Sequence, residues 1–549
     1  MKRFISLIVA LFAVAAVMLT SCNAAEGYMI HDKIVDYVPK DEAMFTNADR
    51  SEIDPDSAAA VITLSGAAGE ISDTSKGSGG DRVIIKTRGI YRVTGSSVNV
   101  SITVDDPAKS GSVYLVLDNV SMKNDFGACI SVKCADKLII YAIGENSLVA
   151  AGETAVNDPV LGSNVDGAIF SKDNLTVNGA EGSSLLVSSS LKGIVVKDDL
   201  KITGSVVSIR SDNVGVEAND SVRIGGGILN IASSEKEGVV IKNSEGNSYC
   251  YAEAGKTTIT SKLDGLKVKG KNSKVVLAGG VLEIEANSDS DAKDPSLSQK
   301  GIVCDGDVMI GKATVKIVSA DDGINCGDSV SLTDGQVNIS TYDDGIHADD
   351  VISVSGGNIE ISRSYEGLEA HSVTISGGKL SVKSSDDGIN AAGDTSDSDV
   401  QNGALKDRTD GKIFISGGEV LIDSGKDGLD SSGSLFVSGG RTVVEGSVNV
   451  GGKKTSVTGG SVIILTSVEK AVNFNAGAQC SALLSLGGNE GTTVSARDGE
   501  DFSFKASKAF GCVVYSSPSL KVGGSCEIVV GTETKTAKFL TSYYYSDVE

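Results

Sequence analysis

The sequence predicts an all-β protein, a parallel β-helix with about 22 residues per coil and a small antiparallel cap near its C-terminal end. The first observation is a repeated glycine followed by a large apolar residue. Successive glycines of this kind are 22, 22, 22, 21 and 40 residues apart, and the last step contains an insertion: Gly301, Gly323, Gly345, Gly367, Gly388 and Gly428. A fixed period of this size is typical of stacked repeats.

The second observation is the pattern inside each repeat. Residues 351–361 read Val-Ile-Ser-Val-Ser-Gly-Gly-Asn-Ile-Glu-Ile, two alternating runs joined by a glycine pair. Alternation of apolar and polar residues puts them on opposite faces of a strand, and a helix would need apolar spacings of three and four. Gly-Gly and Asp-Gly pairs mark the bends. Each unit therefore predicts one coil, which buries its inner face only by stacking on its neighbours.

Two columns of residues are expected to point into the core. One residue after each repeated glycine stands a large apolar side chain: Ile302, Ile324, Ile346, Leu368, Ile389 and Leu429. Three residues after the glycine stands a small one: Cys304, Cys326, Ala348, Ala370, Ala391 and Ser431. The residue between the two columns must then point outward.

The outward column and the bend before the glycine are rich in oxygen ligands. Stacked coils lie about 4.8 Å apart, so neighbouring carboxylates repel unless a cation lies among them. Ca²⁺ takes six to eight oxygen ligands. Asp-Gly is also an ordinary turn pair, but turn formation does not explain Asn, Glu and Asp inside strands. We therefore expect calcium on a set that we call the acidic ladder: Asp321, Asp322, Asn325, Asp343, Asp344, Glu366, Glu369, Asp386, Asp387, Asn390, Asp427 and Asp430.

The first residues read as a targeting segment. Met1-Lys2-Arg3 is basic, residues 4–19 are apolar, and Leu19-Thr20-Ser21-Cys22 resembles a bacterial lipoprotein processing site. The apolar run is too short for a conventional membrane span. We expect residues 1–21 to be removed, Cys22 to carry lipid, and the mature chain to lie outside the cytoplasm, anchored to the bacterial membrane or cell surface. The alternative is an ordinary cleaved signal peptide.

Composition narrows the function classes. The net charge of −23 argues against binding to nucleic acid or to an anionic membrane surface. The chain has 66 glycines and no tryptophan, which fits regular coils without aromatic clefts. Nine cysteines raise the question of disulfides. Cys304 and Cys326 would lie one coil apart, and we favour a stack of small buried residues there over a disulfide.

The chain divides as follows. Residues 22–80 are polar and predict a tether and an N-terminal flap, with the first strand at Val83. Residues 81–470 predict the β-helix and residues 471–549 the C-terminal β cap, which would cover the open end of the solenoid. Polar insertions at 287–299 and 392–411 adjoin the ladder and either wall a groove or are tolerated loop growth. The acidic ladder is local, because coils before Lys300 carry a mixed set of residues at the same positions.

Several stretches resemble a known family, the secreted bacterial carbohydrate-binding β-helix proteins first recognised in cellulose-degrading clostridia. They are residues 89–95 (Gly-Ile-Tyr-Arg-Val-Thr-Gly), the strand at 115–120 with 127–130, the Asp-Asp-Gly-Ile-Asn repeats at 321–325 and 386–390, and residues 507–518. The resemblance covers about residues 80–535. It implies a right-handed parallel β-helix with bound calcium, similar to pectate lyases but regarded as binding polysaccharide. Glu366 and Lys426 depart from the Asp-Asp pattern.

Two functions from different classes are open. In the first, a monomer binds an acidic glycan such as polygalacturonate, because calcium on the ladder bridges two sets of carboxylates. The residues expected to contact sugar border the ladder: Tyr342, His347, Tyr365, Lys300 and Lys426.

In the second function, the protein is a calcium-dependent polysaccharide lyase in which a lysine or arginine removes the proton beside a uronate carboxylate. Lys300, Lys426, Arg363 and Lys383 are near enough in sequence, but charge balance explains each of them as well. The three histidines (His31, His347, His371) offer no triad, so we assign no catalytic residue. A structural surface or adhesion protein without a ligand is a third alternative.

Overall fold

The computed structural model describes residues 44–243, 246–287, 296–391, 410–451, 454–472, 474, 479–498 and 502–545. The chain divides into two compact units, Met1–Met44 and Phe45–Glu549, and the second unit contains all the elements discussed below. Cys22 and His31 lie outside the described residues, as do most of the two predicted insertions. Among the described residues, no helix is long and apolar enough to cross a membrane.

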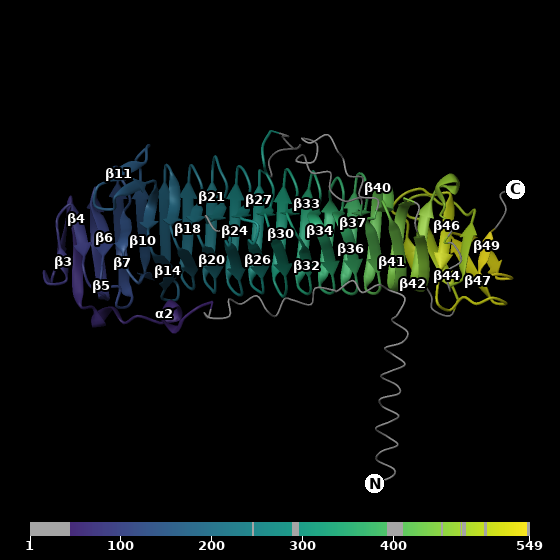
Figure 1. The fold of residues 1–549 in the computed structure, drawn as a ribbon, viewed down its shortest axis with the longest axis horizontal. Helices are drawn as coiled ribbons and strands as arrows, with labels where there is room; N and C mark the ends of the chain where they lie inside the picture. The colour runs from purple at the N-terminus through teal and green to yellow at the C-terminus, as the bar shows by residue number, and fades with distance from the viewer. Residues whose placement is uncertain are drawn as a thin grey trace, which may run out of the picture. The chain divides into compact units, whose positions relative to one another are not determined.

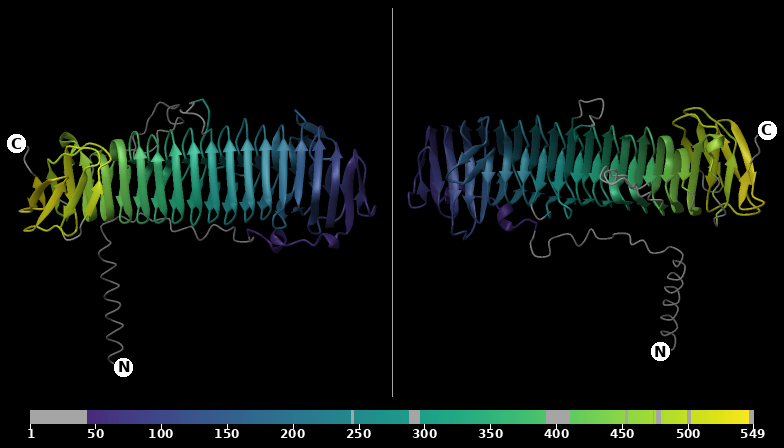
Figure 2. Two further views of the ribbon diagram at one scale, coloured as in Figure 1. Left: turned by 180° about the vertical axis from the view of Figure 1, so that it is seen from behind. Right: turned by 45° about the horizontal axis from the view of Figure 1, so that its top comes forward.

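The second unit is built almost entirely from strands that stack in parallel, side by side along the unit (Figures 1 and 2). The predicted all-β fold with parallel stacking is therefore confirmed. Three stacks run along it. The first, which we call the ladder face because it carries the acidic ladder, consists of β13 (Gly167–Ser171), β16 (Lys192–Val196), β19 (Val216–Ala218), β22 (Val239–Lys242), β25 (Leu266–Lys269), β28 (Ile302–Cys304), β31 (Ile324–Cys326), β34 (Ile346–Val354), β36 (Leu368–Ile375), β38 (Ile389–Ala391) and β40 (Glu419–Ser431).

The second face follows the ladder face in each coil. The long strands β34 and β36 contribute to both faces, because they continue through the bend between them. Its other strands are β14 (Asn174–Gly179), β17 (Asp199–Ile202), β20 (Ser221–Ile224), β23 (Tyr249–Ala252), β26 (Lys274–Leu277), β29 (Asp307–Ile310), β32 (Val330–Leu332) and β39 (Lys412–Ile415).

The third face completes each coil. It leads back to the ladder face of the next coil through the bend that carries the acidic residues. Its strands are β15 (Ser184–Ser189), β18 (Val206–Ser211), β21 (Ile228–Ser233), β24 (Lys256–Ser261), β27 (Val281–Ala286), β30 (Thr314–Ser319), β33 (Gln336–Thr341), β35 (Asn358–Arg363), β37 (Lys379–Ser384) and the first half of β40.

The core lies between the three faces. On the ladder face, Ile302 pairs with Ile324, Ile324 with Ile346 and Ile346 with Leu368. Both predicted inward columns are confirmed, since every one of their side chains is at most 2% exposed. Cys304 and Cys326 are free, buried thiols, as the small-residue stack predicts.

The two kinds of repeated glycine serve different purposes. The second glycine of each Gly-Gly pair needs a left-handed backbone, for example Gly357 at a φ of 80°. The glycines that directly precede the ladder-face strands need space instead. A Cβ on Gly345 would lie 2.6 Å from the carbonyl oxygen of Gly367 and 2.8 Å from Ile361. Glycine thus lets successive coils approach closely, which stacks the acidic residues directly before it.

The strands begin earlier than the sequence pattern indicated. Residues 60–78 form three strands and not a flap, because β1 pairs in parallel with β5 and starts the stack. A short helix, α2 (Asn47–Arg50), and a 3-10 turn, η1 (Pro55–Ser57), precede them. The strands of this end are β1 (Ala60–Gly66), β2 (Ala68–Ile71), β3 (Gly77–Ser78), β4 (Arg82–Ile85), β5 (Gly89–Val98), β6 (Ser101–Asp105), β7 (Val113–Asn124), β8 (Ile130–Cys134), β9 (Lys137–Ile143), β10 (Glu145–Ala150), β11 (Val156–Asp158) and β12 (Ser163–Val165).

At the other end the pairing changes from parallel to antiparallel. Strand β46 pairs antiparallel with β42 and β43, and a separate antiparallel sheet has the order β45-β44-β47-β48. A second apolar cluster, which includes Tyr515 and Phe539, lies here. The strands are β41 (Ser434–Val450), β42 (Lys454–Thr466), β43 (Ser481–Leu484), β44 (Thr493–Arg497), β45 (Phe502–Lys505), β46 (Cys512–Ser516), β47 (Ser525–Val530), β48 (Glu533–Lys538) and β49 (Tyr543–Tyr545), and η2 (Val468–Lys470) follows β42.

Candidate metal centre on the acidic ladder

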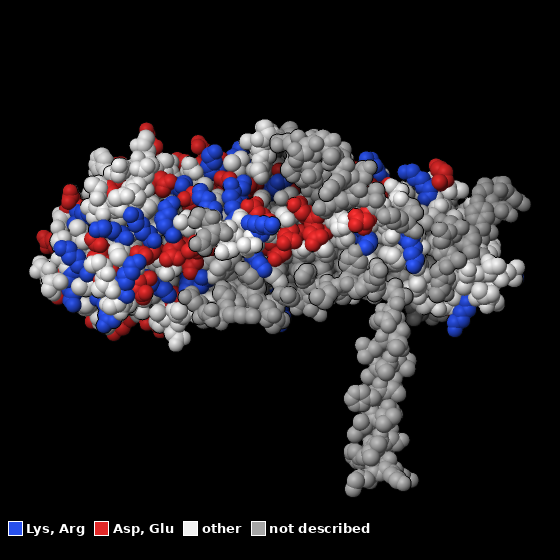
Figure 3. Space-filling view, in the orientation of Figure 1, with Lys and Arg blue, Asp and Glu red and all other residues white. Residues whose placement is uncertain are grey.

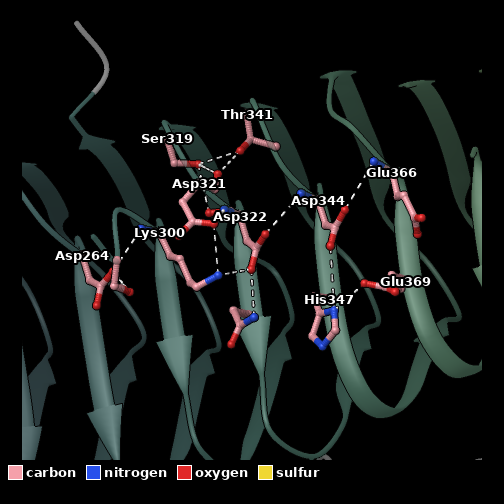
Figure 4. Close-up of polar contacts among 12 residues, drawn as sticks. Asp264, Lys300, Ser319, Asp321, Asp322, Thr341, Asp344, His347, Glu366 and Glu369 are labelled. Carbon is pink, nitrogen blue, oxygen red and sulfur yellow. Dashed lines mark hydrogen bonds and ion pairs between the residues drawn. The ribbon is translucent and has the colours of Figure 1, made fainter. Parts of the chain in front are cut away.

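The outward column of the ladder is continuous in the structure. Parallel pairing places its members beside one another in the order Asn325, His347, Glu369, Asn390 and Asp430. The bend residues before the glycines form a second column above them, as Figure 4 shows for one part of the ladder. Acidic side chains gather near the middle of the face in Figure 3, whereas acidic and basic side chains mix over the N-terminal half. The predicted convergence of two polar columns is therefore present.

A lysine neutralises the first end of the ladder. Lys300 Nζ lies 3.1 Å from Asp321 and also pairs with Asp322, and both carboxylates are buried. Burial lowers the pKa of Lys300, but the two carboxylates outweigh burial and hold this pKa above its ordinary value. The amide of Asn325 donates a 2.8 Å hydrogen bond to Asp322. Carboxylate oxygens of Asp321, Asp322 and Asp343 approach within 4.8 Å of one another, but the ammonium reduces their need for a metal.

An imidazole stands in the middle of the ladder. His347 Nδ1 lies 2.7 Å from Glu369 and 3.9 Å from Asp344, and Nε2 lies 3.3 Å from Asp349. Burial lowers the pKa of His347, but the hydrogen bonds to Asp349 and Glu369 outweigh burial and raise the pKa above its ordinary value. His347 therefore carries a positive charge that compensates its carboxylate neighbours, and both of its ring nitrogens face protein. Its predicted contact with sugar would have to be made through the ring surface.

Asp344 links this cluster to the neighbouring coils. It accepts a hydrogen bond from the backbone of Glu366 at 3.3 Å, and its own amide donates to Asp322 at 3.2 Å. Burial, followed by the charges of Asp322 and Glu369, raises the pKa of Asp344. Figure 4 shows the side chain between these two carboxylates. The ladder thus holds more negative charge here than the buried groups can keep ionised without a cation.

The far end of the ladder has the donor set best suited to calcium. Carboxylate oxygens of Glu366, Asp386 and Asp387 approach within 4.8 Å of one another. The Asn390 amide donates to Glu366 at 2.9 Å, and Asn390 Oδ1 is buried without a hydrogen-bond partner. A buried carbonyl oxygen without a donor is costly unless a cation or another group meets it. Hard oxygens of this kind are calcium ligands.

Basic partners at the far end reach only one of these three carboxylates among the described residues. Lys426 Nζ lies 2.5 Å from Asp386. In the part of the chain that the structure describes, no lysine or arginine pairs with Glu366 or Asp387. Burial, followed by the charge of Glu369, raises the pKa of Glu366 to about 8. Burial, followed by the charges of Asp386 and the next coil, raises the pKa of Asp387 to about 6. A divalent cation would return both groups to their ionised state.

The earlier coils of the ladder face show what the protein does where it supplies its own cations. Glu217 on β19 is only 4% exposed and lies 2.9 Å from Lys192, 3.2 Å from Lys197 and 3.1 Å from Lys242. Asp264 is likewise buried and lies 2.6 Å from Lys267. Lysines therefore balance these two carboxylates, from neighbouring coils for Glu217 and from the same coil for Asp264. Glu366 and Asp387 differ from Glu217 and Asp264 in this respect, because no lysine or arginine among the described residues pairs with them.

Replacement of Glu217 by glutamine is expected to lower stability in a pH-dependent way. Burial raises the pKa of Glu217, but the lysines outweigh burial and lower the pKa to about 2. A lowered carboxyl pKa stabilises the folded state above the ordinary value and loses this effect as the pH falls through the folded value. Urea unfolding should show wild type more stable by about 3 kcal/mol at pH 7. The difference should shrink between about pH 4.5 and pH 2; a difference independent of pH would contradict this role.

The aromatic residues beside the ladder differ in accessibility. The Arg363 guanidinium lies 3.6 Å from the centre of the Tyr342 ring, so one face of this ring is already occupied. Tyr365 is 45% exposed and lies beside Asp386 and Lys426, whose side chain is also exposed. Of the two tyrosines, Tyr365 is better placed to meet a ligand. Sequence reasoning missed the Arg363–Tyr342 stack and the carboxylate of Asp349 on His347, because neither follows from the repeat.

Three comparisons with known proteins were made. A polysaccharide lyase-like protein from C. thermocellum, solved as a gadolinium derivative, is 24% identical over 51% of this chain and 96% of its own, with a TM-score of 0.36. No curated protein matches the chain. The model of a family described as "carbohydrate-binding domain-containing protein" matches residues 79–345 and 339–503, which is more than half of the chain. This protein belongs to that carbohydrate-binding domain-containing family.

Proposed function

We propose that this protein binds an acidic polysaccharide of the polygalacturonate type through calcium held on the acidic ladder. Membership of a carbohydrate-binding family supports polysaccharide binding in general. The observation that carries the finer proposal is the far end of the ladder. Among the described residues, Glu366 and Asp387 there have no basic partner, and Asn390 Oδ1 is buried without a donor. These three residues would hold the ion, with Asp427 and Asp430 of the next coil beside them.

Calcium would supply a positive charge with coordination positions open to the carboxylates of the glycan. The protein has a net charge of −23 and would repel an acidic polymer without such a bridge. The residues of the ladder fix the positions of the donor groups, because each lies on a strand or bend whose neighbours are set by parallel pairing. Lys426 and Tyr365, which lie beside the far end of the ladder, would contact the sugar directly, because both side chains are exposed to solvent.

The lyase alternative finds less support in the geometry. A lyase of the expected kind needs an amine or guanidinium that accepts a proton beside the metal. Lys300 is held by Asp321 and Asp322, and Lys426 by Asp386, so both ammonium groups are stabilised in the charged form. Arg363 lies over Tyr342. We therefore favour binding without cleavage.

The test of the proposed function is the calcium dependence of glycan binding. Binding of polygalacturonate should be measured by calorimetry in calcium, in chelator, and after calcium is restored, with product absorbance followed in parallel. The proposal expects binding only when calcium is present, without unsaturated products. Equal binding in chelator would reject the role of calcium, and unsaturated products would establish the lyase.

We further propose a right-handed solenoid with coils of about 22 residues, in which the antiparallel sheet β45-β44-β47-β48 and strand β46 cap the C-terminal end. An apolar cluster beneath these strands supports a capping role, because the last coil would otherwise expose its core. The protein would act as a monomer outside the cytoplasm, and the targeting segment at residues 1–21 is the feature that supports this location.

Replacement of Cys22 by alanine is expected to release the protein from membranes. This expectation rests on the sequence Leu19-Thr20-Ser21-Cys22, which follows an apolar run. Lipid attached to Cys22 would anchor the mature chain to the membrane. Membrane fractionation of cells that express wild type and Cys22→Ala measures the release, and the mass of the mature protein reports the acyl groups. A variant that remains in the membrane, together with a wild-type mass without acyl groups, would show that the protein is not lipid-anchored at Cys22.

A further inference from the structure

The segment around α2 lies across the second face of the solenoid, far from the ladder in sequence. Its anchor is Asp49, which is fully buried. The Asp49 carboxylate lies 2.7 Å from Lys137 Nζ and 3.3 Å from Lys201 Nζ, and it accepts a 2.8 Å hydrogen bond from Thr176. Burial raises the pKa of Asp49, but these contacts outweigh burial and hold the pKa well below its ordinary value. We call residues 45–52 the strap.

The strap is attached at further points along its length. The Arg50 guanidinium pairs with Glu253 and lies 4.5 Å from the centre of the Phe45 ring. The Asn178 amide donates a 3.1 Å hydrogen bond to the backbone carbonyl of Ser51. A Cβ on Gly225 would lie 2.7 Å from Phe45, so the solenoid is shaped to accept this ring. The strap therefore has a fixed position across β14, β17, β20 and β23.

A cleft of about 370 Å³ lies where the strap meets the bends that follow β14 and β17. This volume falls within the usual range for small-molecule sites, roughly 300–1,000 Å³. The strap supplies Arg50 and Glu52, and the bends supply Asn178–Ser183 and Thr203–Val206. Tyr141 and Ile228 line the remainder, and Ile228 is 40% exposed. The cleft thus belongs to coils well before the acidic ladder.

The chemistry of this cleft differs from that of the ladder. It combines a positioned guanidinium, two exposed carboxylates at Glu52 and Glu181, an apolar side chain, and the hydroxyl group of Ser205, which is hydrogen-bonded to the buried Ser183. A sugar is complementary to this mixture of polar and apolar groups, because its hydroxyl groups alternate with C–H surfaces. An acidic sugar is disfavoured here, because the two carboxylates would repel it and the Arg50 guanidinium is already paired with Glu253. Among the described residues, the candidate metal clusters all lie on the ladder and none in this cleft.

We propose that this cleft is a second carbohydrate site, which takes a neutral sugar unit without a metal ion. Glu52 and Glu181 accept hydrogen bonds from sugar hydroxyl groups, Arg50 donates to a sugar oxygen, and Ile228 contacts a C–H surface. Asp49 is a positioning residue, because it holds the wall that carries Arg50 and Glu52. The site is independent of the proposed calcium function, so either can fail without the other.

The test uses the full-length protein in chelator, with cellohexaose and mannohexaose as neutral probes in calorimetry. Wild type should bind at least one probe, and the Asp344→Ala/Asp387→Ala protein should bind it equally well. Ala180→Trp fills the cleft, and Glu52→Ala with Glu181→Ala removes exposed acceptors without touching the core. Each change should weaken binding by at least about tenfold. Glu360→Ala, an exposed glutamate on β35, is the matched control and should have no effect.

Release of the strap gives a second, independent measurement. Asp49→Ala should raise hydrogen exchange in residues 45–52 and weaken binding of the neutral probe to the same extent, while polygalacturonate binding in calcium stays unchanged. Three results would overturn the proposal: no binding of either neutral probe by wild type, binding that survives Ala180→Trp, or binding that disappears when calcium is removed. The last result would place the neutral sugar on the ladder.

Discussion

Replacement of both Asp344 and Asp387 by alanine is expected to abolish calcium-dependent binding of polygalacturonate and to leave the solenoid folded. The two residues belong to two different candidate metal clusters of the ladder. The inward columns are untouched, because Ile346 and Ile389 remain fully buried beside them. Calcium at a hundred times its Kd should stabilise wild type by about 2.7 kcal/mol and the variant by little. Thermal melting with and without calcium measures both effects.

In chelator, the double substitution is expected to leave the melting temperature unchanged or to raise it. Without calcium, the pKa of Asp344 is raised and that of Asp387 is raised to about 6, so placing these two carboxyl groups in the folded ladder at pH 7 opposes folding. In chelator the double variant should therefore melt at the same temperature as wild type or above it. Asp350→Ala with Glu360→Ala removes two exposed negative charges and is the control for net charge. A double variant that still gains stability from calcium would place the ion elsewhere.

Leu368→Ala is expected to lower the free energy of unfolding by roughly 2–5 kcal/mol, because it leaves a cavity in a close-packed interior. Leu368 is fully buried and stacks between Ile346 and Ile389 in successive coils. Neighbouring coils approach too closely at their glycines to collapse into the gap. Urea unfolding measures the loss. Thr374→Ala, on the outward side of the same strand, should cost much less, and equal losses would contradict the assigned faces.

The repeat let the sequence predict the regular part of the fold. The position of each repeated glycine fixed which residues point inward, and Ile324, Cys326 and Ala348 lie where the pattern places them. The first strands were missed because residues 60–78 lack the repeat and join the stack through pairing of β1 with β5. The strap was missed for a similar reason. Asp49 contacts Lys137 and Lys201, which are 88 and 152 residues away in the sequence, and no local sequence pattern predicts contacts of this kind.

The sequence predicted which residues of the candidate site share a column, but it did not predict which of their carboxylates pair with a lysine or arginine. Alternation placed Asn325, Glu369 and Asn390 on the outside of the coils, and pairing of the strands bears this out. Which carboxylates already have a cation depends on the reach of long side chains. Lys300 folds onto Asp321 and Asp322, whereas Glu366 has no such partner among the described residues. Side-chain direction and burial decide this, and neither can be read from spacing alone.

The most direct test of the central claim is the position of calcium in crystals grown with an oligogalacturonate. An anomalous difference map identifies the ion without reference to the ligand density. We expect a peak about 2.3–2.6 Å from oxygens of Glu366 and Asp387 and from Asn390 Oδ1, with a glycan carboxylate on its open side. A ladder without a peak, beside well-ordered glycan that contacts the protein elsewhere, would contradict the claim that calcium on the ladder recognises the polysaccharide.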